Sequence, residues 1–149
     1  MAGECYMRIG FVGCVKRKAD RPMPAQELYT SSLFIKRRKF VEESCDSWWI
    51  LSAEHGLVSP HEVLAPYDRA LKDATPLEKR RWSAQVLDAV SLRISAEAGD
   101  IAEFHAGKDY RDFGLVAGML RANWRIENPT EGMRIGSQLQ FYARALNNE

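Results

Sequence analysis

Side chains that can carry out acid–base chemistry or bind planar rings occur in four short segments, separated by apolar stretches. His55 and Asp68 form a possible acid–base pair, and Lys108 could act with them as a nucleophile or proton carrier. Tyrosine rings stack on planar bases, while lysine and arginine pair with anions such as phosphate. The residues that could bind a substrate in these ways are Cys14, Lys16, Lys18, Tyr29, Ser31, Tyr67, Tyr110 and Arg111.

Each of these segments also has a purely structural explanation. The cations after Gly13 could form a solvated basic loop, and Cys14 could be a small residue at a strand end. His55 and Asp68 could simply brace their loop through hydrogen bonds. Residues 108–111 could be the charged start of a helix. The sequence therefore leaves two alternatives: these residues form a functional site, or they only stabilise the loops in which they lie.

Alternating strands and helices are expected to position these segments. Short apolar runs, rich in aromatic and β-branched residues, predict strands at residues 6–12, 47–52, 100–105 and 124–127. Apolar stripes at helical spacing predict helices at residues 25–45, 77–97, 112–121 and 131–146. Thr75 and Pro76 are typical of a helix N-cap and its first helical position. These helical stripes are explained by packing on a sheet.

This order of elements predicts a single α/β domain over residues 1–149, with a mainly parallel sheet of about four strands and helices on both faces. In such folds the loops after the strands meet at the carboxyl edge of the sheet, where ligands bind. The four polar segments follow the four expected strands. We therefore expect them to surround one site at that edge.

Composition narrows the class of protein. Lys and Arg number 21 against 20 Asp and Glu, so a net charge of +1 gives no general affinity for nucleic acid, and any basic effect is local. The cysteines Cys5, Cys14 and Cys45 do not form a disulfide framework, and no cysteine or histidine spacing predicts a metal or another cofactor. The chain shows no signal peptide and no apolar run of membrane-spanning length, so we expect a cytoplasmic protein without membrane contact.

Several motifs resemble known families across essentially the whole chain. They are GCVKRKAD, LYTSSLF, WWILSAEHGLVSPHEVLAPYD, FHAGKDYRD and GMRIGSQLQFY. In their order they are similar to a domain of uncharacterised function common in bacteria and phages. More distantly, the segments at residues 51–68, 107–111 and 141–142 resemble the family of the peroxide-stress protein YaaA. The loop at residues 14–18 is similar to one in a domain of archaeosine synthase. These resemblances imply an α/β fold and a link to nucleic-acid or nucleobase chemistry.

Together these observations favour an enzyme that acts on a nucleotide, nucleoside or modified nucleobase, either free or within DNA or RNA. In this hypothesis Lys16 and Lys18 neutralise phosphate and Tyr67 and Tyr110 hold the planar base. Asp68 acts with His55 and Lys108 as a base or charge stabiliser, as in N-glycosidic chemistry. The alternatives are a non-catalytic module that binds nucleotides or nucleic acid, and a protein–protein adaptor. The sequence sets no oligomeric state.

Overall fold

A five-stranded sheet forms the centre of the molecule in the computed structural model, which describes residues 5–13 and 18–147. Its strands are β1 (Arg8–Gly13), β3 (Ser47–Ser52), β4 (Gly56–Val58), β6 (Ile101–His105) and β7 (Arg125–Glu127), in the order β4-β3-β1-β6-β7. All neighbouring strands run parallel except β4, which is antiparallel to β3. The predicted α/β class with a mainly parallel sheet is confirmed.

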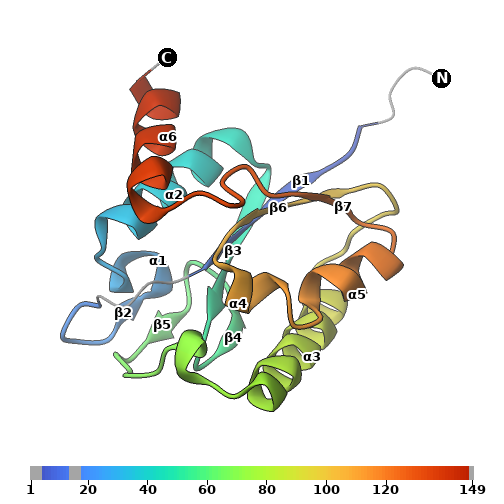
Figure 1. Cartoon of the computed structure of the whole chain (residues 1–149), viewed down its shortest axis with the longest axis horizontal. Coiled ribbons are helices and arrows are strands. Elements are labelled where there is room, and N and C mark those ends of the chain that lie inside the picture. The colour runs from blue at the N-terminus through green and yellow to red at the C-terminus, as the bar shows by residue number, and fades with distance from the viewer. Residues whose placement is uncertain (1–4, 14–17, 148–149) are drawn as a thin grey trace.

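Helices cover both faces of this sheet (Figure 1). The helices α2 (Ser32–Ser44) and α6 (Ile135–Asn147) pack together on one face. On the other face lie α3 (Pro76–Arg93) and α5 (Leu115–Arg121), together with the short α4 (Lys108–Arg111). Two further short elements, α1 (Ala25–Leu28) and the 3-10 turn Leu71–Asp73, lie in the connections.

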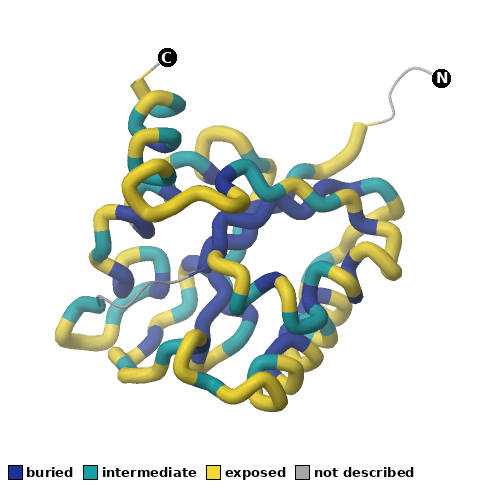
Figure 2. Tube along the Cα trace, viewed as in Figure 1, coloured by how far each residue is buried: buried dark blue, intermediate teal, exposed yellow. Residues whose placement is uncertain are grey.

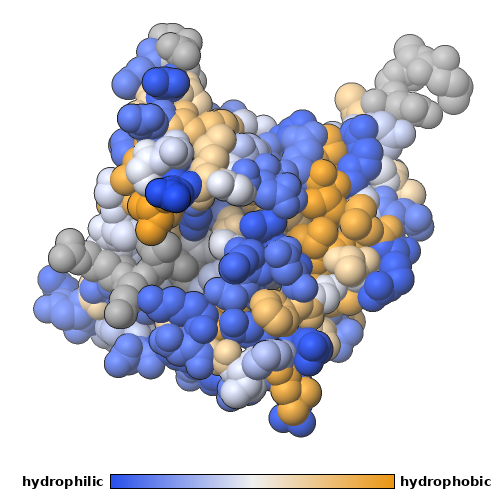
Figure 3. All heavy atoms as spheres, viewed as in Figure 1, coloured by the Kyte–Doolittle hydropathy of each residue, from blue (hydrophilic) through white to orange (hydrophobic). Residues whose placement is uncertain are grey.

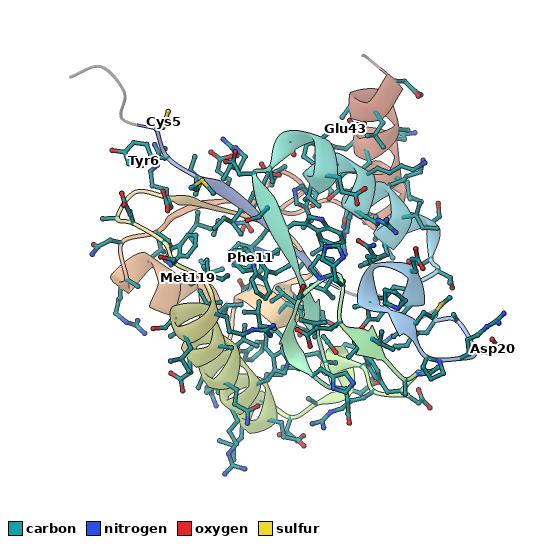
Figure 4. All side chains as sticks on the ribbon, turned by 180° about the vertical axis from the view of Figure 1, so that it is seen from behind. Cys5, Tyr6, Phe11, Asp20, Glu43 and Met119 are labelled. Carbon is teal, nitrogen blue, oxygen red and sulfur yellow. The ribbon has the colours of Figure 1, made fainter. Side chains whose placement is uncertain are left out.

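The central strands are buried on both faces, which explains their nearly continuous apolar sequence (Figure 2). Successive side chains of β1 enter different cores. Phe11 packs with Phe104 and Met119 on the α3–α5 side, and Figure 4 shows Phe11 near the middle of the molecule. Val12 packs with Phe34 on the α2 side. The sheet thus has a separate apolar core on each face, and polar side chains that could form a site are expected at its edges.

The sheet has one strand more than the sequence predicted. Residues 56–58 were expected in a loop, but they form β4, because Gly56 has a φ of +70° and lets the chain turn back on β3. A second, two-stranded sheet pairs β2 (Met23–Pro24) with β5 (Val63–Leu64). Strands of two or three residues carry too little periodicity to be recognised in a sequence.

The expected helix at residues 25–45 is two helices. Tyr29 leaves helical geometry to form an isolated antiparallel bridge with Lys18. Ser31 then caps α2, because its side chain accepts a hydrogen bond from the backbone N–H of Phe34. This break directs the Tyr29 side chain into the core on the α2 side, where it is 1% exposed and its hydroxyl reaches that of Tyr67.

The other helices follow the predictions more closely. Thr75 caps α3 in a capping box with Glu78, and Pro76 is the first helical residue, as expected. The expected helix at residues 112–121 begins only at Leu115, because Gly114 directly before it has a φ of +127°. Residues 108–111, expected in the loop after the third strand, form the separate turn α4. The last helix begins at Ile135, four residues later than expected.

Candidate functional site

The carboxyl ends of β1 and β6 form the point where the chain connections diverge. After β1 the chain passes to β3 on one side, and after β6 it passes to β7 on the other. In open α/β sheets this divergence opens a crevice that binds ligands. Gly13 ends β1 there, and a Cβ atom on it would lie 2.8 Å from that of Ala106, so the two backbones approach too closely for a larger residue. Cys14 and Lys16 follow Gly13 and lie outside the described residues.

A cluster of hydroxyl groups and rings lies at the end of β3, the strand next to β1. The hydroxyls of Tyr29 and Tyr67 are 2.7 Å apart, and Ser52 donates a hydrogen bond of 2.9 Å to the Tyr67 hydroxyl. The Lys18 Nζ lies 4.3 Å from the centre of the Tyr67 ring and 5.8 Å from that of Tyr29. Segments around residues 18, 29, 52 and 67 therefore converge on one place, and Lys18, Tyr29 and Tyr67 were predicted as site residues.

His55 joins this cluster from the turn between β3 and β4. Its backbone N–H donates to the Ser52 Oγ at 3.0 Å, and its ring stands edge-on to the Tyr67 ring with 5.4 Å between their centres. His55 is exposed, whereas Ser52 is fully buried. The His55 imidazole is therefore exposed to solvent, next to hydroxyl groups that hydrogen bonds hold in place. We refer below to Lys18, Tyr29, Ser52, His55 and Tyr67 as the tyrosine cluster.

Tyr110 approaches the same region from the β6 side. It contacts both hydrophobic cores, and its ring stands edge-on to Trp82 at 5.3 Å. The Trp82 indole in turn donates a hydrogen bond of 2.8 Å to the backbone carbonyl of Ser52. A Cβ atom on Gly13 would lie 3.6 Å from the Tyr110 ring. Tyr110 is therefore half-buried between the end of β1 and the Trp82 side chain, which contacts Ser52 of the tyrosine cluster.

The remaining predicted residues have different surroundings. Asp68 and Lys108 are exposed, and neither makes an ion pair or a side-chain hydrogen bond with another described residue. Asp68 follows Tyr67 directly, and Lys108 begins α4. Ser31 is occupied in capping α2. Arg111 is buried, donates to the Ala106 carbonyl at 3.0 Å and pairs with Glu131 at 3.3 Å, so it braces the loop after β6.

A second polar group, missed in the sequence, is buried beneath α2 and α6. The His105 ring bonds to Glu103 through Nε2 at 2.7 Å and to the Tyr142 hydroxyl through Nδ1 at 2.6 Å. Arg37 is also buried, and it donates to the Gly13 carbonyl at 3.2 Å and to Gln138 at 2.9 Å. The i, i+2 spacing of Glu103 and His105 on a strand is the signal that could have revealed this network. It braces the end of β1 from behind.

Burial and charge set the protonation of this network. Burial lowers the pKa of His105 below 6.5, so the imidazole is neutral at neutral pH, although Glu103 opposes this shift. For Glu103, burial raises the pKa, but hydrogen bonds from His105 and Arg8 outweigh it and hold the pKa below 4.5. Burial also raises the pKa of the Tyr142 hydroxyl. A neutral His105 then donates through Nε2 to the Glu103 carboxylate and accepts from Tyr142 through Nδ1.

The surface around these groups is mixed. Figure 3 shows hydrophilic residues over α4, while hydrophobic ones gather over α5. Within residues 5–13 and 18–147, His, Cys, Asp and Glu side chains form no group of three able to hold a metal ion. In the same part of the chain, no helix has both the length and the apolar character needed to cross a bilayer.

Comparison with known proteins gives a family but no activity. A family model described as "Family of unknown function (DUF6884)" matches residues 9–144, which include every strand of the central sheet except the first residue of β1. No curated protein matches the chain. The function must therefore be inferred from the site itself.

Proposed function

The chain belongs to this family of unknown function, and we propose that it is an enzyme that acts on a nucleotide, nucleoside or modified nucleobase at its carboxyl edge. The observation that carries the proposal is the tyrosine cluster, in which Lys18 lies over the ring of Tyr67 and an exposed His55 stands edge-on to the same ring. Flat rings, a cation and an imidazole are the groups that bind a base, attract a phosphate and move a proton.

The cluster divides these roles among its members. Ser52 accepts hydrogen bonds from the His55 backbone N–H and the Trp82 indole, and it donates to the Tyr67 hydroxyl, which it thereby holds in place. The ring of His55 is left at the surface, where it can exchange a proton with a substrate and with water. Asp68, one residue beyond Tyr67, supplies an exposed carboxylate that can act as a base or stabilise a cationic centre, as N-glycosidic chemistry requires. Lys108, at the start of α4, supplies a cation from beyond the end of β6.

A further reason to propose this substrate class is the sequence motifs at residues 14–18, 51–68 and 107–111, which resemble motifs of the YaaA and archaeosine synthase families. The alternative is a non-catalytic module that binds the same ligands. It is favoured by the backbone hydrogen bond of His55, which also suits a residue that only braces its turn. The two hypotheses predict the same binding but differ in turnover.

A ligand panel tests binding first. Nucleoside monophosphates, nucleosides, free bases, DNA and RNA are added to the purified chain, and the melting temperature is measured. We expect at least one class to raise the melting temperature of the wild-type chain, and His55→Ala to reduce the rise. His61→Ala is the matched control, because His61 is an exposed histidine outside the tyrosine cluster. If no class raises the melting temperature, the proposal is wrong.

Turnover of the ligand found in this way then separates the enzyme from the binding module. Asp68→Asn removes a charge but keeps the shape, and it should slow turnover by about a hundredfold or more, with affinity little changed. Asp88→Asn, on the exposed side of α3, is the control. Lys108→Ala should weaken phosphate-bearing ligands, with a loss that shrinks as salt rises. Binding without any turnover of the wild-type chain would support the module instead.

A further inference from the structure

A groove of about 800 Å³ lies between the outer face of α2 and the last turns of α6. Figure 1 shows these two helices side by side. The apolar part of the lining comes from Ile35 on α2 and from Ala143 and Leu146 on α6. The buried face of α2, with Phe34 and Val41, points away from this groove into the core. The groove is therefore a surface feature that the fold does not fill.

Hydrogen-bond donors dominate the polar part of the lining. They are the hydroxyls of Thr30 and Ser32, the ammonium groups of Lys36 and Lys39, and the amide of Asn147. Neither lysine makes an ion pair with another described residue. Because Ser32, Lys36 and Lys39 are four and three residues apart, α2 presents them in a row along one face.

Glu43, the one carboxylate among the described residues of the lining, lies at one end of this row. Figure 4 shows Glu43 near the end of α2, far from the loop that carries Asp20. The donors Thr30, Ser32 and Lys36 are at the opposite end. An anionic ligand is therefore attracted to the first two turns of α2.

That end of the groove adjoins the tyrosine cluster. Thr30 follows Tyr29 directly, and Tyr29 is held to Lys18 by a backbone bridge and to Tyr67 through their hydroxyls. Thr30, which lines the groove, is therefore next in the chain to a member of the tyrosine cluster, and the two places lie at the same end of α2. A ligand larger than a mononucleotide could occupy both places.

We propose that this groove binds the phosphodiester backbone of a single nucleic-acid strand, one nucleotide of which enters the candidate site. The inference rests on the proposed function and narrows its substrate class from free nucleotides to a polynucleotide. Phosphate oxygens are contacted in proteins by lysine, serine, threonine and asparagine side chains, the types found here. The apolar residues between them suit the sugars of the strand.

The test compares strand binding with mononucleotide binding. Single-stranded DNA and RNA of about twelve nucleotides are titrated against the wild-type chain and against the double variant Lys36→Ala/Lys39→Ala, at salt from about 50 to 200 mM. The control Arg80→Ala/Arg121→Ala removes the same charge from exposed positions on α3 and α5, across the sheet. Nucleoside monophosphates are titrated in parallel, and a polyglutamate peptide of similar length supplies a protein-like polyanion.

We expect the double variant to bind the strand more weakly and with a slope of log K against log salt smaller by about 1.4, since each phosphate contact to a single strand contributes about 0.7. The control should keep the wild-type slope, and mononucleotide binding should be unchanged. The DNA and RNA arms identify the natural strand. If mononucleotides bind but the double variant binds the strand as tightly as the wild-type chain does, the inference is wrong and the proposed function stands. If polyglutamate shows the same lysine dependence, the groove binds acidic protein segments and the inference is overturned.

Discussion

At the scale of single residues, the least expected feature is the charge buried behind β1. Arg37 and Glu103 are each only 4% exposed, and His105 is completely buried. Burying ionised groups is costly unless each is paired, and here Glu103 is paired with Arg8 and hydrogen-bonded to His105. Arg37 contacts the carbonyl of Gly13, the last residue of β1, which precedes Lys18 of the tyrosine cluster in the chain. The buried network therefore costs folding stability, and it fixes the backbone where β1 ends, at the candidate site.

Acid should weaken this arrangement in two stages. The pKa of His105 is lowered by burial in the folded chain, so the unfolded chain binds more protons and stability falls as the pH drops below about 6.5. The pKa of Glu103 is also lowered, and its contribution is lost as the pH falls further, below about 4.5. Urea unfolding at pH values from about 7 down to about 3 should show both losses, because the second begins only below about 4.5.

Two histidine variants assign the first stage. His105→Gln removes the group that titrates, so its free energy of unfolding should depend less on pH between about 6.5 and 5 than that of the wild-type chain. His61→Gln, at an exposed position, should keep the wild-type dependence. An unchanged pH dependence in His105→Gln would show that His105 does not limit acid stability.

At the scale of elements, breaks in the helices place the functional side chains. The break at Tyr29 turns its ring toward Tyr67, and the break at Gly114 separates α4, which carries Lys108, from α5. Gly114 has a φ of +127°, a backbone conformation that residues other than glycine rarely adopt.

Substitution of Gly114 should therefore be costly. Gly114→Ala should lower the free energy of unfolding by about 1–3 kcal/mol, because the backbone is strained once a Cβ is present. Gly136→Ala is the matched control: a Cβ at Gly136 meets no atom within 4 Å, and alanine favours α6 by about 0.5–1 kcal/mol. Equal effects of the two variants in urea unfolding would contradict a special role for the Gly114 turn.

The same elements show what the sequence could and could not predict. Long apolar runs and stripes identified β1, β3, β6 and the α3 helix, because burial on a sheet imposes a strong pattern. Strand order predicted that the segments around Lys18, His55 and Tyr67 lie at the same edge of the sheet, but it did not predict how Tyr29 reaches Tyr67. Ser52 and the Glu103–His105 pair were missed, because a polar residue in an apolar strand has a partner only in three dimensions. The breaks at Tyr29 and Gly114 depend on long-range bridges and on a single φ angle.

At the scale of the whole molecule, the tyrosine cluster lies between a rigid part and a weakly held part. The central strands are paired on both sides and enclosed by two cores. The β2–β5 sheet has only two residues in each strand, and backbone bonds such as that from Ala25 N–H to the Glu62 carbonyl, 2.7 Å, attach it to α1. Lys18 and Tyr67 lie in the chain on either side of this small sheet.

Local opening of the β2–β5 sheet should therefore occur without global unfolding. In native-state hydrogen exchange, the amides of Phe11, Ile50 and Phe104 should exchange only through global unfolding, because they belong to the buried central strands. The Leu64 amide, in the small sheet, should exchange at a clearly lower free energy. A ligand that binds Lys18 and Tyr67 together should slow exchange at Leu64, because it holds the β2–β5 sheet in its closed conformation. Exchange at Phe104 should stay unchanged. Equal exchange free energies at Leu64 and Phe104 in the free chain would show that the two sheets unfold as one unit, and that the candidate site is rigid before any ligand arrives.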